Sequence, residues 1–183
     1  MKLNLGSGQS PMSGYVNVDM FPPADVIHDL NVTPWPWDTS SVDGIRANHI
    51  LEHLGATADG FIAIMREIYR VSKPGAIIDI VIPHPFHPSF FTDPTHVRPL
   101  MPETFRLFSK SYNRECAEKH LADSPLGLHY DVDFDLTHIE IRIDKSMEWI
   151  FGRRDWTQED RFRWAERHVG AIQSAQVILR VVK

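Results

Sequence analysis

Histidine and acidic side chains concentrate in two short stretches of the first half of the chain. His49, Glu52 and His53 lie within five residues of one another, and a second group spans thirteen residues. The second group contains His84, His87, Asp93 and His96. Imidazole is the side chain that most often takes a proton in catalysis, and together with carboxylate it also binds metals. The first stretch therefore offers candidate bases for proton transfer, and the second predicts either a proton-transfer site or a metal site.

A glycine-rich segment at the start of the chain predicts a nucleoside site. The run Leu3-Asn4-Leu5-Gly6-Ser7-Gly8 reads as a strand followed by a glycine loop, and Val16-Asn17-Val18-Asp19 reads as a second strand that ends on an acid. Glycine lets the backbone approach a ligand closely, because it has no Cβ. A carboxylate at the end of the second strand can accept hydrogen bonds from both ribose hydroxyls. Adenosine is the ligand that we expect.

Length and composition indicate one intracellular globular domain. The chain has 183 residues with 43% hydrophobic and 23% charged content, which suits a single domain over residues 1–183. We find no apolar run long enough for a membrane span and no signal peptide, and so expect a cytoplasmic protein without a membrane partner. A net charge of −5 gives no general attraction to nucleic acid. The single cysteine, Cys116, has no partner for an internal disulfide.

The hydrophobic pattern predicts alternating strands and helices, and hence a doubly wound α/β sheet. The expected strands are residues 2–5, 15–19, 25–30, 44–48, 76–82, 137–143 and 176–182. Helical segments are expected at residues 50–54, 57–71, from 102 and at 157–167. The run 76–82 is apolar except for Asp79, which favours a strand buried on both faces.

In this order, the motifs resemble those of the class I S-adenosylmethionine-dependent methyltransferases. The resemblance rests on the Leu3–Gly8 loop, Asp19, Asp29-Leu30, the segment Asn48–Leu54 after the fourth strand, and the segment Glu67–Ala76 before the fifth. It covers residues 2–83 well and the two final strands by pattern only. The family implies a Rossmann-like, mostly parallel seven-stranded sheet with the last strand antiparallel, in three α/β/α layers. It also implies S-adenosyl-L-methionine as the cofactor.

The resemblance assigns roles to individual residues. The backbone of Gly6, Ser7 and Gly8 would hold the methionine part of the cofactor, and Asp19 would hold the ribose. The remaining cofactor-binding positions that it implies are Asn4 and Met20, Asp29 and Leu30 beside the adenine, and Asn48 and His49 beside the sulfonium.

Two spacings distinguish this chain from related nucleotide-binding proteins. A dinucleotide site needs an acid about 20 residues beyond its glycine motif, whereas Asp19 comes eleven residues after Gly8. The methyltransferase family places a full helix in the same interval, but residues 9–14 hold at most about one helical turn. The family also carries residues before its first strand that this sequence lacks, so we expect cover for the substrate to come from residues 83–138 or from a partner subunit.

Candidate catalytic and substrate-binding residues follow the fourth and fifth strands. His84, between Pro83 and Pro85, is our first candidate for the general base and His49 is the second. A hydrogen bond from His84 to a loop carbonyl is the alternative. The substrate-binding candidates are His87, Asp93, His96 and Arg98.

Further features of the same loop leave alternatives open. We expect Asp93 to orient His96, and no bound metal, because the spacings match no standard zinc pattern. Arg98 could clamp an anionic group of the substrate or pair with Glu103. Phe86, Phe90 and Phe91 could line a substrate pocket or form the core of the loop itself.

A helical insertion at residues 145–170 holds the main basic concentration of the chain. Its arginines are Arg153, Arg154, Arg161, Arg163 and Arg167, interleaved with Asp155, Glu159, Asp160 and Glu166. Most of this surface is expected to be a salt-bridged, solvated face rather than a nucleic-acid site. Aromatic residues in the insertion, Trp149, Trp156, Phe162 and Trp164, could form a homodimer interface.

The sequence thus predicts methyl transfer from S-adenosylmethionine to oxygen or nitrogen of a small-molecule or glycan-like acceptor. One alternative is a non-catalytic module that binds S-adenosylmethionine. Another is a nucleotide or nucleic-acid methyltransferase that uses the arginine-rich insertion.

Overall fold

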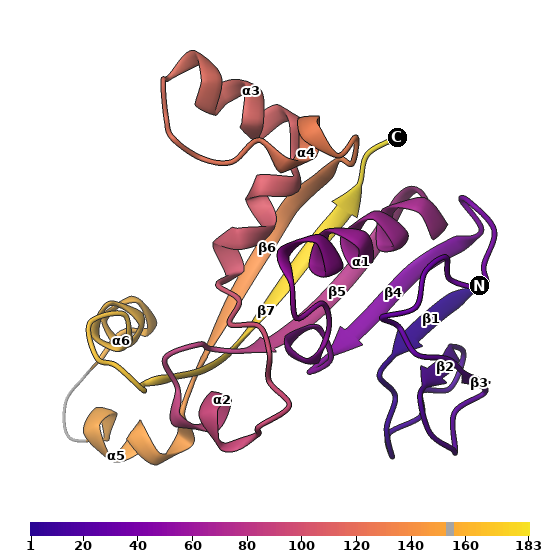
Figure 1. Ribbon diagram of the computed structural model, residues 1–183. Helices are drawn as coiled ribbons and strands as arrows, with labels where there is room; N and C mark the ends of the chain where they lie inside the picture. The colour runs from indigo at the N-terminus through magenta and orange to yellow at the C-terminus, as the bar shows by residue number, and fades with distance from the viewer. Residues whose placement is uncertain (153–155) are drawn as a thin grey trace.

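A seven-stranded sheet forms the centre of the computed structural model, which describes residues 1–152 and 156–183 (Figure 1). The strand order is β3-β2-β1-β4-β5-β7-β6. Strands β1 to β5 pair in parallel, while β7 runs antiparallel to both β5 and β6. The strands are β1 Lys2–Leu5, β2 Val16–Asp19, β3 Val26–Ile27, β4 Val42–Asn48, β5 Ser72–Pro83, β6 Phe134–Ile143 and β7 Ile172–Val181. The predicted mostly parallel, Rossmann-like sheet with an antiparallel last strand is confirmed.

The helices follow the fourth, fifth and sixth strands. They are η1 Leu51–His53, α1 Ala58–Val71, α2 Pro88–Thr92, η2 Pro102–Phe108, α3 Lys110–Glu118, α4 Leu126–His129, η3 Lys145–Met147, α5 Glu148–Phe151 and α6 Gln158–Ala165. Threonine side chains cap the N-termini of two helices that the sequence predicts. The side chain of Thr57 accepts from the N–H of Gly60 before α1, and Thr157 forms a capping box with Asp160 before α6. None of the described helices is long and apolar enough to cross a bilayer.

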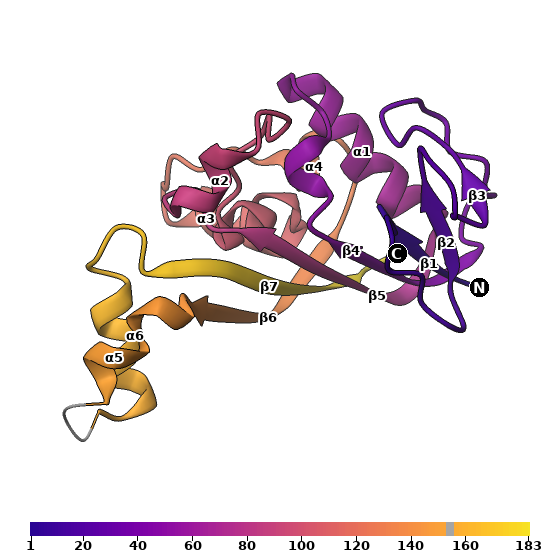
Figure 2. The ribbon, with the colours of Figure 1, turned by 90° about the horizontal axis from the view of Figure 1, so that it is seen from below.

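Helices α1 to α4 lie on one face of the sheet (Figure 2). Ile78, Ile80 and Ile82 of β5 are fully buried on that face, whereas Ile77 on the opposite face is 45% exposed. Asp79, also on the opposite face, pairs with Arg46 and accepts a hydrogen bond from Gln176 (2.6 Å). The prediction that this strand is buried on both faces therefore fails at Ile77 and Asp79, although Val81, further along the same face, is fully buried.

The expected three-layer arrangement differs from the structure in the same way. Residues 9–14, between β1 and β2, form turns, and only short connections link β2, β3 and β4. The described chain therefore supplies no helices there to cover the second face. The apolar residues of β1, β4, β5 and β7 instead join one core cluster under α1 and η2, which includes Leu3, Ile45, Ile80 and Val177.

A buried carboxylate ties α1 to the segment before β4. Glu67 accepts hydrogen bonds from the backbone N–H of Trp35 (2.7 Å) and from the guanidinium of Arg70 (2.7 and 2.8 Å). Burial acts to raise the pKa of Glu67, but the hydrogen bonds and the charge of Arg70 outweigh it and hold that pKa below its usual range. Arg70 also donates to the carbonyls of Trp35 and Trp37. The pair thus anchors a segment that has no helix of its own.

We predict that Glu67→Gln lowers the melting temperature by about 4–8 °C at pH 7, equivalent to about 2 kcal/mol for lost charge-assisted hydrogen bonds. Because the folded-state pKa of Glu67 is lowered, its stabilisation is present above the pKa of the unfolded chain. It is lost as the pH falls through the folded-state pKa. Thermal melts should therefore converge for the two proteins in acid. Glu115→Gln, in the exposed pair with Lys119, is the control and should change little; a difference for Glu67→Gln that does not depend on pH would contradict the account.

Candidate functional site

The glycine loop after β1 is held close to the segment that follows β4. Gly6 has φ +63°, and a Cβ at this position would lie 2.6–2.7 Å from side-chain atoms of Ile50. The N–H of Ser7 donates to the carbonyl of Val18 (3.1 Å), which ties the loop to β2. Any residue other than glycine at position 6 would thus be strained in its backbone and would collide with Ile50.

Asp19 fixes the other side of the loop. Its carboxylate accepts from the N–H of Gly8 (2.9 Å) through Oδ2 and from the N–H of Phe21 (3.1 Å) through Oδ1. Each carboxylate oxygen keeps a further acceptor position for a ligand hydroxyl. The predicted acid therefore lies directly against the predicted glycine loop.

Two features of the loop suit a bound ligand. The Oγ of Ser7 is buried and has no hydrogen-bond partner among the described residues. A Cβ at Gly8, which has φ +49°, would meet nothing within 4 Å, so the backbone there faces open space. Asn4, by contrast, donates to Asn17 (2.9 Å) and is buried beneath the loop, so it supports the loop rather than facing a ligand.

The other predicted cofactor residues lie at the same edge of the sheet in different environments. Asp29 accepts from the N–H and the side-chain amide of Asn31, and the carbonyl of buried Leu30 accepts from the indole N–H of Trp35. Met20 is 52% exposed. Asn48 is exposed at the end of β4. A turn thus holds Asp29 and Leu30, the two residues expected beside the adenine. The carbonyl of Leu30 is already bonded, so only its backbone N–H is left for a ligand.

His49 and Glu52 form a hydrogen-bonded pair at the carboxyl end of β4. The N–H of His49 donates to the carbonyl of Val81 in β5 (2.9 Å), and its φ of +52° turns the chain into η1. Its Nδ1 lies 3.1 Å from Oε1 of Glu52. Because a carboxylate can only accept, Nδ1 carries the proton and the lone pair of the ring is on Nε2. The side chain of His49 is 46% exposed while that of Glu52 is 1% exposed, so the imidazole faces outward and its carboxylate partner is buried.

His84 lies on a separate cavity. The cavity holds about 270 Å³ between η2, β6 and the end of α6. Its lining includes His84, Phe86, Met101, Glu103, Ile139 and Arg167. Burial lowers the pKa of His84, which favours the neutral ring, and its Nδ1 accepts a long hydrogen bond from the N–H of Phe86 (3.4 Å). Most of this lining has no local signal in the sequence, because its residues come from segments far apart in the chain and the insertion closes over them.

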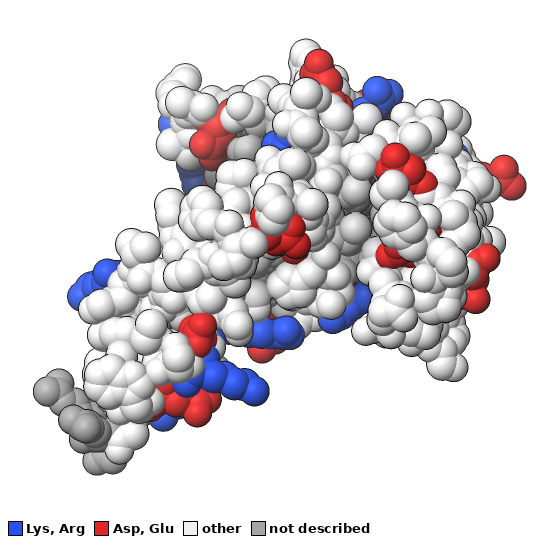
Figure 3. Space-filling view, turned by 60° about the horizontal axis from the view of Figure 1, so that its bottom comes forward, with Lys and Arg blue, Asp and Glu red and all other residues white. Residues whose placement is uncertain are grey.

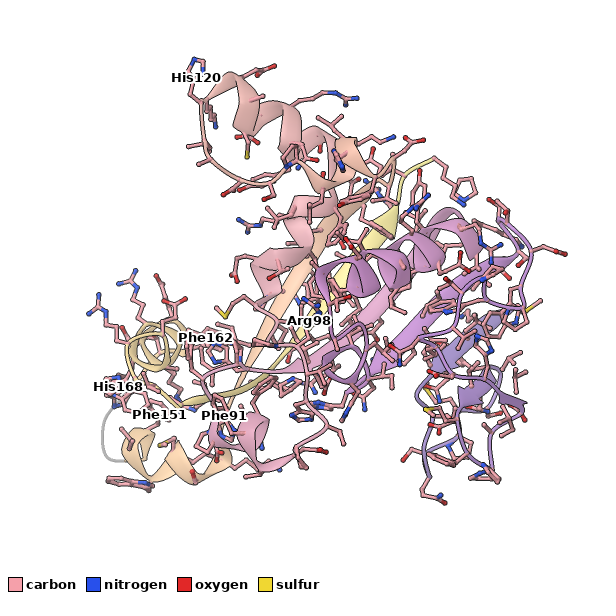
Figure 4. The ribbon with its side chains drawn as sticks, in the orientation of Figure 1. Phe91, Arg98, His120, Phe151, Phe162 and His168 are labelled. Carbon is pink, nitrogen blue, oxygen red and sulfur yellow. The ribbon has the colours of Figure 1, made fainter. Side chains whose placement is uncertain are left out.

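The predicted substrate residues do not share one site. His87 is 7% exposed, donates from Nε2 to Asp144 (2.7 Å) and accepts from the N–H of Ser89, so both ring nitrogens are used inside the protein. The expectation that His87 contacts substrate is corrected on this ground. Phe90 is buried within the loop, while Phe91 is 73% exposed (Figure 4).

The expected orientation of His96 by Asp93 is also corrected. Oδ2 of Asp93 lies 4.0 Å from Nε2 of His96, too far for a hydrogen bond, whereas Nδ1 of His96 donates to the carbonyl of Phe90 (2.7 Å). Asp93 instead accepts from the hydroxyl and the N–H of Thr95, and these bonds hold the pKa of Asp93 below its usual range.

Arg98 holds the loop before α1 rather than pairing with Glu103. Its guanidinium donates to the carbonyls of Gly55 and Thr57, and it lies over the ring of Phe61 at 4.7 Å (Figure 4). Burial lowers the pKa of Arg98. With two loop carbonyls as its partners, Arg98 is a structural clamp in this arrangement.

The insertion carries mixed charge and an aromatic cluster of its own. Lys and Arg side chains lie among Asp and Glu side chains at that end of the molecule (Figure 3), and Arg163 pairs with Glu159. Arg153, Arg154 and Asp155 are outside the described residues. Phe151 packs edge-on against Trp156 and Trp164, so these aromatic rings contact one another rather than forming a flat apolar surface.

Comparison with solved structures identifies the fold as that of S-adenosylmethionine-dependent methyltransferases. A methyltransferase of this class from Archaeoglobus fulgidus superposes with a TM-score of 0.62 at 16% identity, over 98% of this chain and 85% of that one. The YcgJ protein of Bacillus subtilis gives 0.55 at 14% identity, over 100% and 91%. The [4+2]-cyclase SpnF gives 0.52 at 13% identity, over 99% and 75%.

No protein-family model matches the sequence, and no curated protein matches it. Because one of the similar structures is named as a cyclase, the fold alone does not determine the reaction. The chemistry must therefore be argued from the site.

We predict that Gly6→Ala destabilises the protein more than Gly14→Ala does. Both positions have positive φ, which costs about 1–2 kcal/mol for alanine, but only at position 6 would the new methyl group collide with Ile50. The collision should add about 1–3 kcal/mol. Urea denaturation of the two variants measures the difference, and equal losses of stability would show that the loop does not depend on its contact with Ile50.

Proposed function

We propose that this protein is a methyltransferase that uses S-adenosyl-L-methionine and methylates oxygen or nitrogen of a small-molecule or glycan-like acceptor. The observation that carries the proposal is the His49–Glu52 pair at the end of β4, in the segment whose Ile50 packs against the glycine loop. This contact brings a nucleoside-type loop and an oriented base to the same edge of the sheet. Ligands of open α/β sheets bind at that edge.

The chain offers a consistent set of cofactor contacts. The open backbone at Gly8 and the unpartnered Oγ of Ser7 suit the amino-acid part of the cofactor, and the spare acceptor positions of Asp19 suit the two ribose hydroxyls. The free carboxylate oxygen of Asp29 and the N–H of Leu30 suit the adenine. Bound S-adenosylmethionine supplies an electrophilic methyl group on sulfur. With no helix after the loop, helix-dipole stabilisation of its carboxylate is missing, so we expect modest affinity.

His49 is the residue that we assign to proton removal, ahead of His84. Its Nε2 lone pair is exposed, and Glu52 stabilises the imidazolium that forms when an acceptor O–H or N–H gives up its proton. As the acceptor atom bonds to the methyl carbon, the methyl–sulfur bond breaks and neutral S-adenosylhomocysteine leaves. His84 has no carboxylate hydrogen-bonded to its ring among the described residues.

The acceptor class is inferred from the cavity beside His84, which directly follows β5. That strand pairs with β4, and the N–H of His49 donates to the carbonyl of its Val81. A volume of about 270 Å³ suits a small molecule or one or two sugar rings, and its lining mixes Phe86, Met101 and Ile139 with the polar Glu103 and Arg167. Mixed charge on the insertion does not favour a nucleic-acid acceptor.

We predict saturable binding of S-adenosylmethionine and S-adenosylhomocysteine in calorimetric titrations, with no binding of NAD. Asp19→Ala should weaken both by at least about 10-fold, because the ribose loses its acceptors and Gly8 loses its partner. Asp59→Ala, an exposed acid at the start of α1, is the matched control and should leave both affinities unchanged. Absence of binding to the native protein would refute the proposed cofactor.

We predict that His49→Gln lowers the rate of S-adenosylhomocysteine formation with any active acceptor by about 10²–10⁴-fold. Binding of S-adenosylmethionine should change less than about threefold, because the amide retains a donor to Glu52. His84→Gln should act mainly on KM through the acceptor cavity. A full rate in His49→Gln together with a lost rate in His84→Gln would reverse the assignment of the base.

A further inference from the structure

Three side chains with metal-binding chemistry converge beside the proposed base. Glu52 and His53 lie in η1, and His96 lies in the loop between α2 and η2. One potential ligand atom from each of the three lies within 4.8 Å of the other two. The two imidazole rings are in contact, with their centroids 4.7 Å apart. Neighbouring positions in the sequence could not indicate this cluster, because His96 is 43 residues beyond His53.

Hydrogen bonds set both histidines in the form that binds metals. The hydroxyl of Thr95 donates to Oδ1 of Asp93 (2.6 Å), so its oxygen must accept the hydrogen bond from Nδ1 of His53 (2.9 Å). Nδ1 of His96 donates to the carbonyl of Phe90 (2.7 Å). Both rings therefore carry a proton on Nδ1 and a lone pair on Nε2, as metal-ligating histidines do when a protein acceptor fixes their other nitrogen.

Glu52 supplies a buried carboxylate oxygen that lacks a partner. Its Oε1 accepts from His49, but Oε2 is buried and accepts no hydrogen bond within the described part of the chain. A buried carboxylate oxygen without a donor is unfavourable, and a bound cation would satisfy it. This orphaned atom is an observation independent of the proximity of the three side chains.

The backbone holds the two halves of the cluster together. The N–H groups of Val97 and Arg98 both donate to the carbonyl of Glu52 (2.9 and 3.1 Å), so the loop that carries His96 is bonded directly to η1. A second carboxylate lies near the cluster, since Oδ2 of Asp93 is 4.0 Å from Nε2 of His96. The ligand set is thus fixed by the fold.

We propose that Glu52, His53 and His96 bind a divalent first-row transition metal. Two imidazole nitrogens and a carboxylate suit Zn²⁺, Fe²⁺, Mn²⁺ or Co²⁺, whereas Mg²⁺ and Ca²⁺ prefer oxygen ligands. Bonds of about 2.1 Å place ligand atoms about 3.4 Å apart in a tetrahedral site, so a spacing of up to 4.8 Å has to shorten by at most about 1.4 Å when the metal binds. Three protein ligands leave a position open for another group.

The location of the site suggests how the open position is used. Glu52 contacts both the proposed metal and the proposed base, so an acceptor oxygen bound to the metal would lie close to His49. This use of the metal rests on the proposed function, whereas metal binding itself does not. The expectation of no metal came from a different grouping, His84, His87, Asp93 and His96, in which His87 is bonded to Asp144 instead.

The test is a titration of tag-free, chelator-treated protein with Co²⁺, followed by visible absorption. We expect one equivalent of Co²⁺ to bind, Zn²⁺ to displace it, and a 100-fold excess of Mg²⁺ to leave it in place. His53→Gln and His96→Gln should each weaken Co²⁺ binding by at least about 10-fold. His138→Gln, at an exposed position on β6, is the matched control and should bind as the native protein does.

Circular dichroism shows whether each variant folds, and either histidine variant decides the outcome if the other does not fold. No saturable Co²⁺ binding up to about 1 mM, or equal affinity in His96→Gln and the native protein, would overturn the proposal. S-adenosylhomocysteine is titrated into the same proteins. A histidine variant that loses Co²⁺ binding but still binds S-adenosylhomocysteine would show that the metal site is independent of the cofactor site. A native protein that binds Co²⁺ but not S-adenosylhomocysteine would refute the proposed function and leave the metal site standing.

Discussion

The contact between Gly6 and Ile50 is the constraint on which the site depends. Backbone without a Cβ at position 6 lets the loop after β1 pack directly on the segment after β4, and any larger residue would force the two apart. Ile50 lies between His49 and Glu52, so the same contact sets the glycine loop relative to the proposed base. Through the carbonyl of Glu52 it also sets the loop that carries His96. One close approach thus positions three chemically active segments.

The sheet is asymmetric, and this asymmetry explains why the site is arranged as it is. Helices α1 to α4 bury one face (Figure 2), while the other carries the polar network of Arg46, Asp79 and Gln176. With no helix after β1, the glycine loop is held by side-chain contacts, chiefly the carboxylate of Asp19, instead of by a helix terminus. The described chain therefore builds the site from loops fixed by carboxylates and backbone carbonyls.

Local sequence patterns predicted the elements well wherever a single capping residue or the regular spacing of apolar residues determines the structure. The apolar period of α1 and its Thr57 cap, the capping box before α6, and the glycine loop with its acid are all present. The predicted strand at residues 25–30 shrinks to Val26–Ile27, because Asp29 caps a turn with Asn31. Hydrogen bonds from a side chain to nearby backbone compete with those of the sheet and can end a strand, and the hydrophobic pattern does not reveal them.

The candidate site was less predictable because its geometry depends on contacts distant in sequence. Nothing local indicates that His87 is bonded to Asp144, or that Arg98 binds the carbonyls of Gly55 and Thr57. The pairing of His49 with Glu52 joins residues only three apart in the sequence, at the turn that leads into η1. The meeting of His53 with His96 has no local signal, and neither does the closing of the insertion over His84.

The most direct test of the account is a titration of ¹⁵N-labelled protein with S-adenosylhomocysteine, followed by amide resonances. We predict saturable shifts at Gly6, Ser7 and Gly8, whose backbone would contact the ligand, and at Phe21, whose N–H donates to the same carboxylate of Asp19 as that of Gly8. Amides around the His84 cavity should change little. Shifts confined to that cavity, or no shifts at millimolar ligand, would contradict the claim that the glycine loop binds the cofactor.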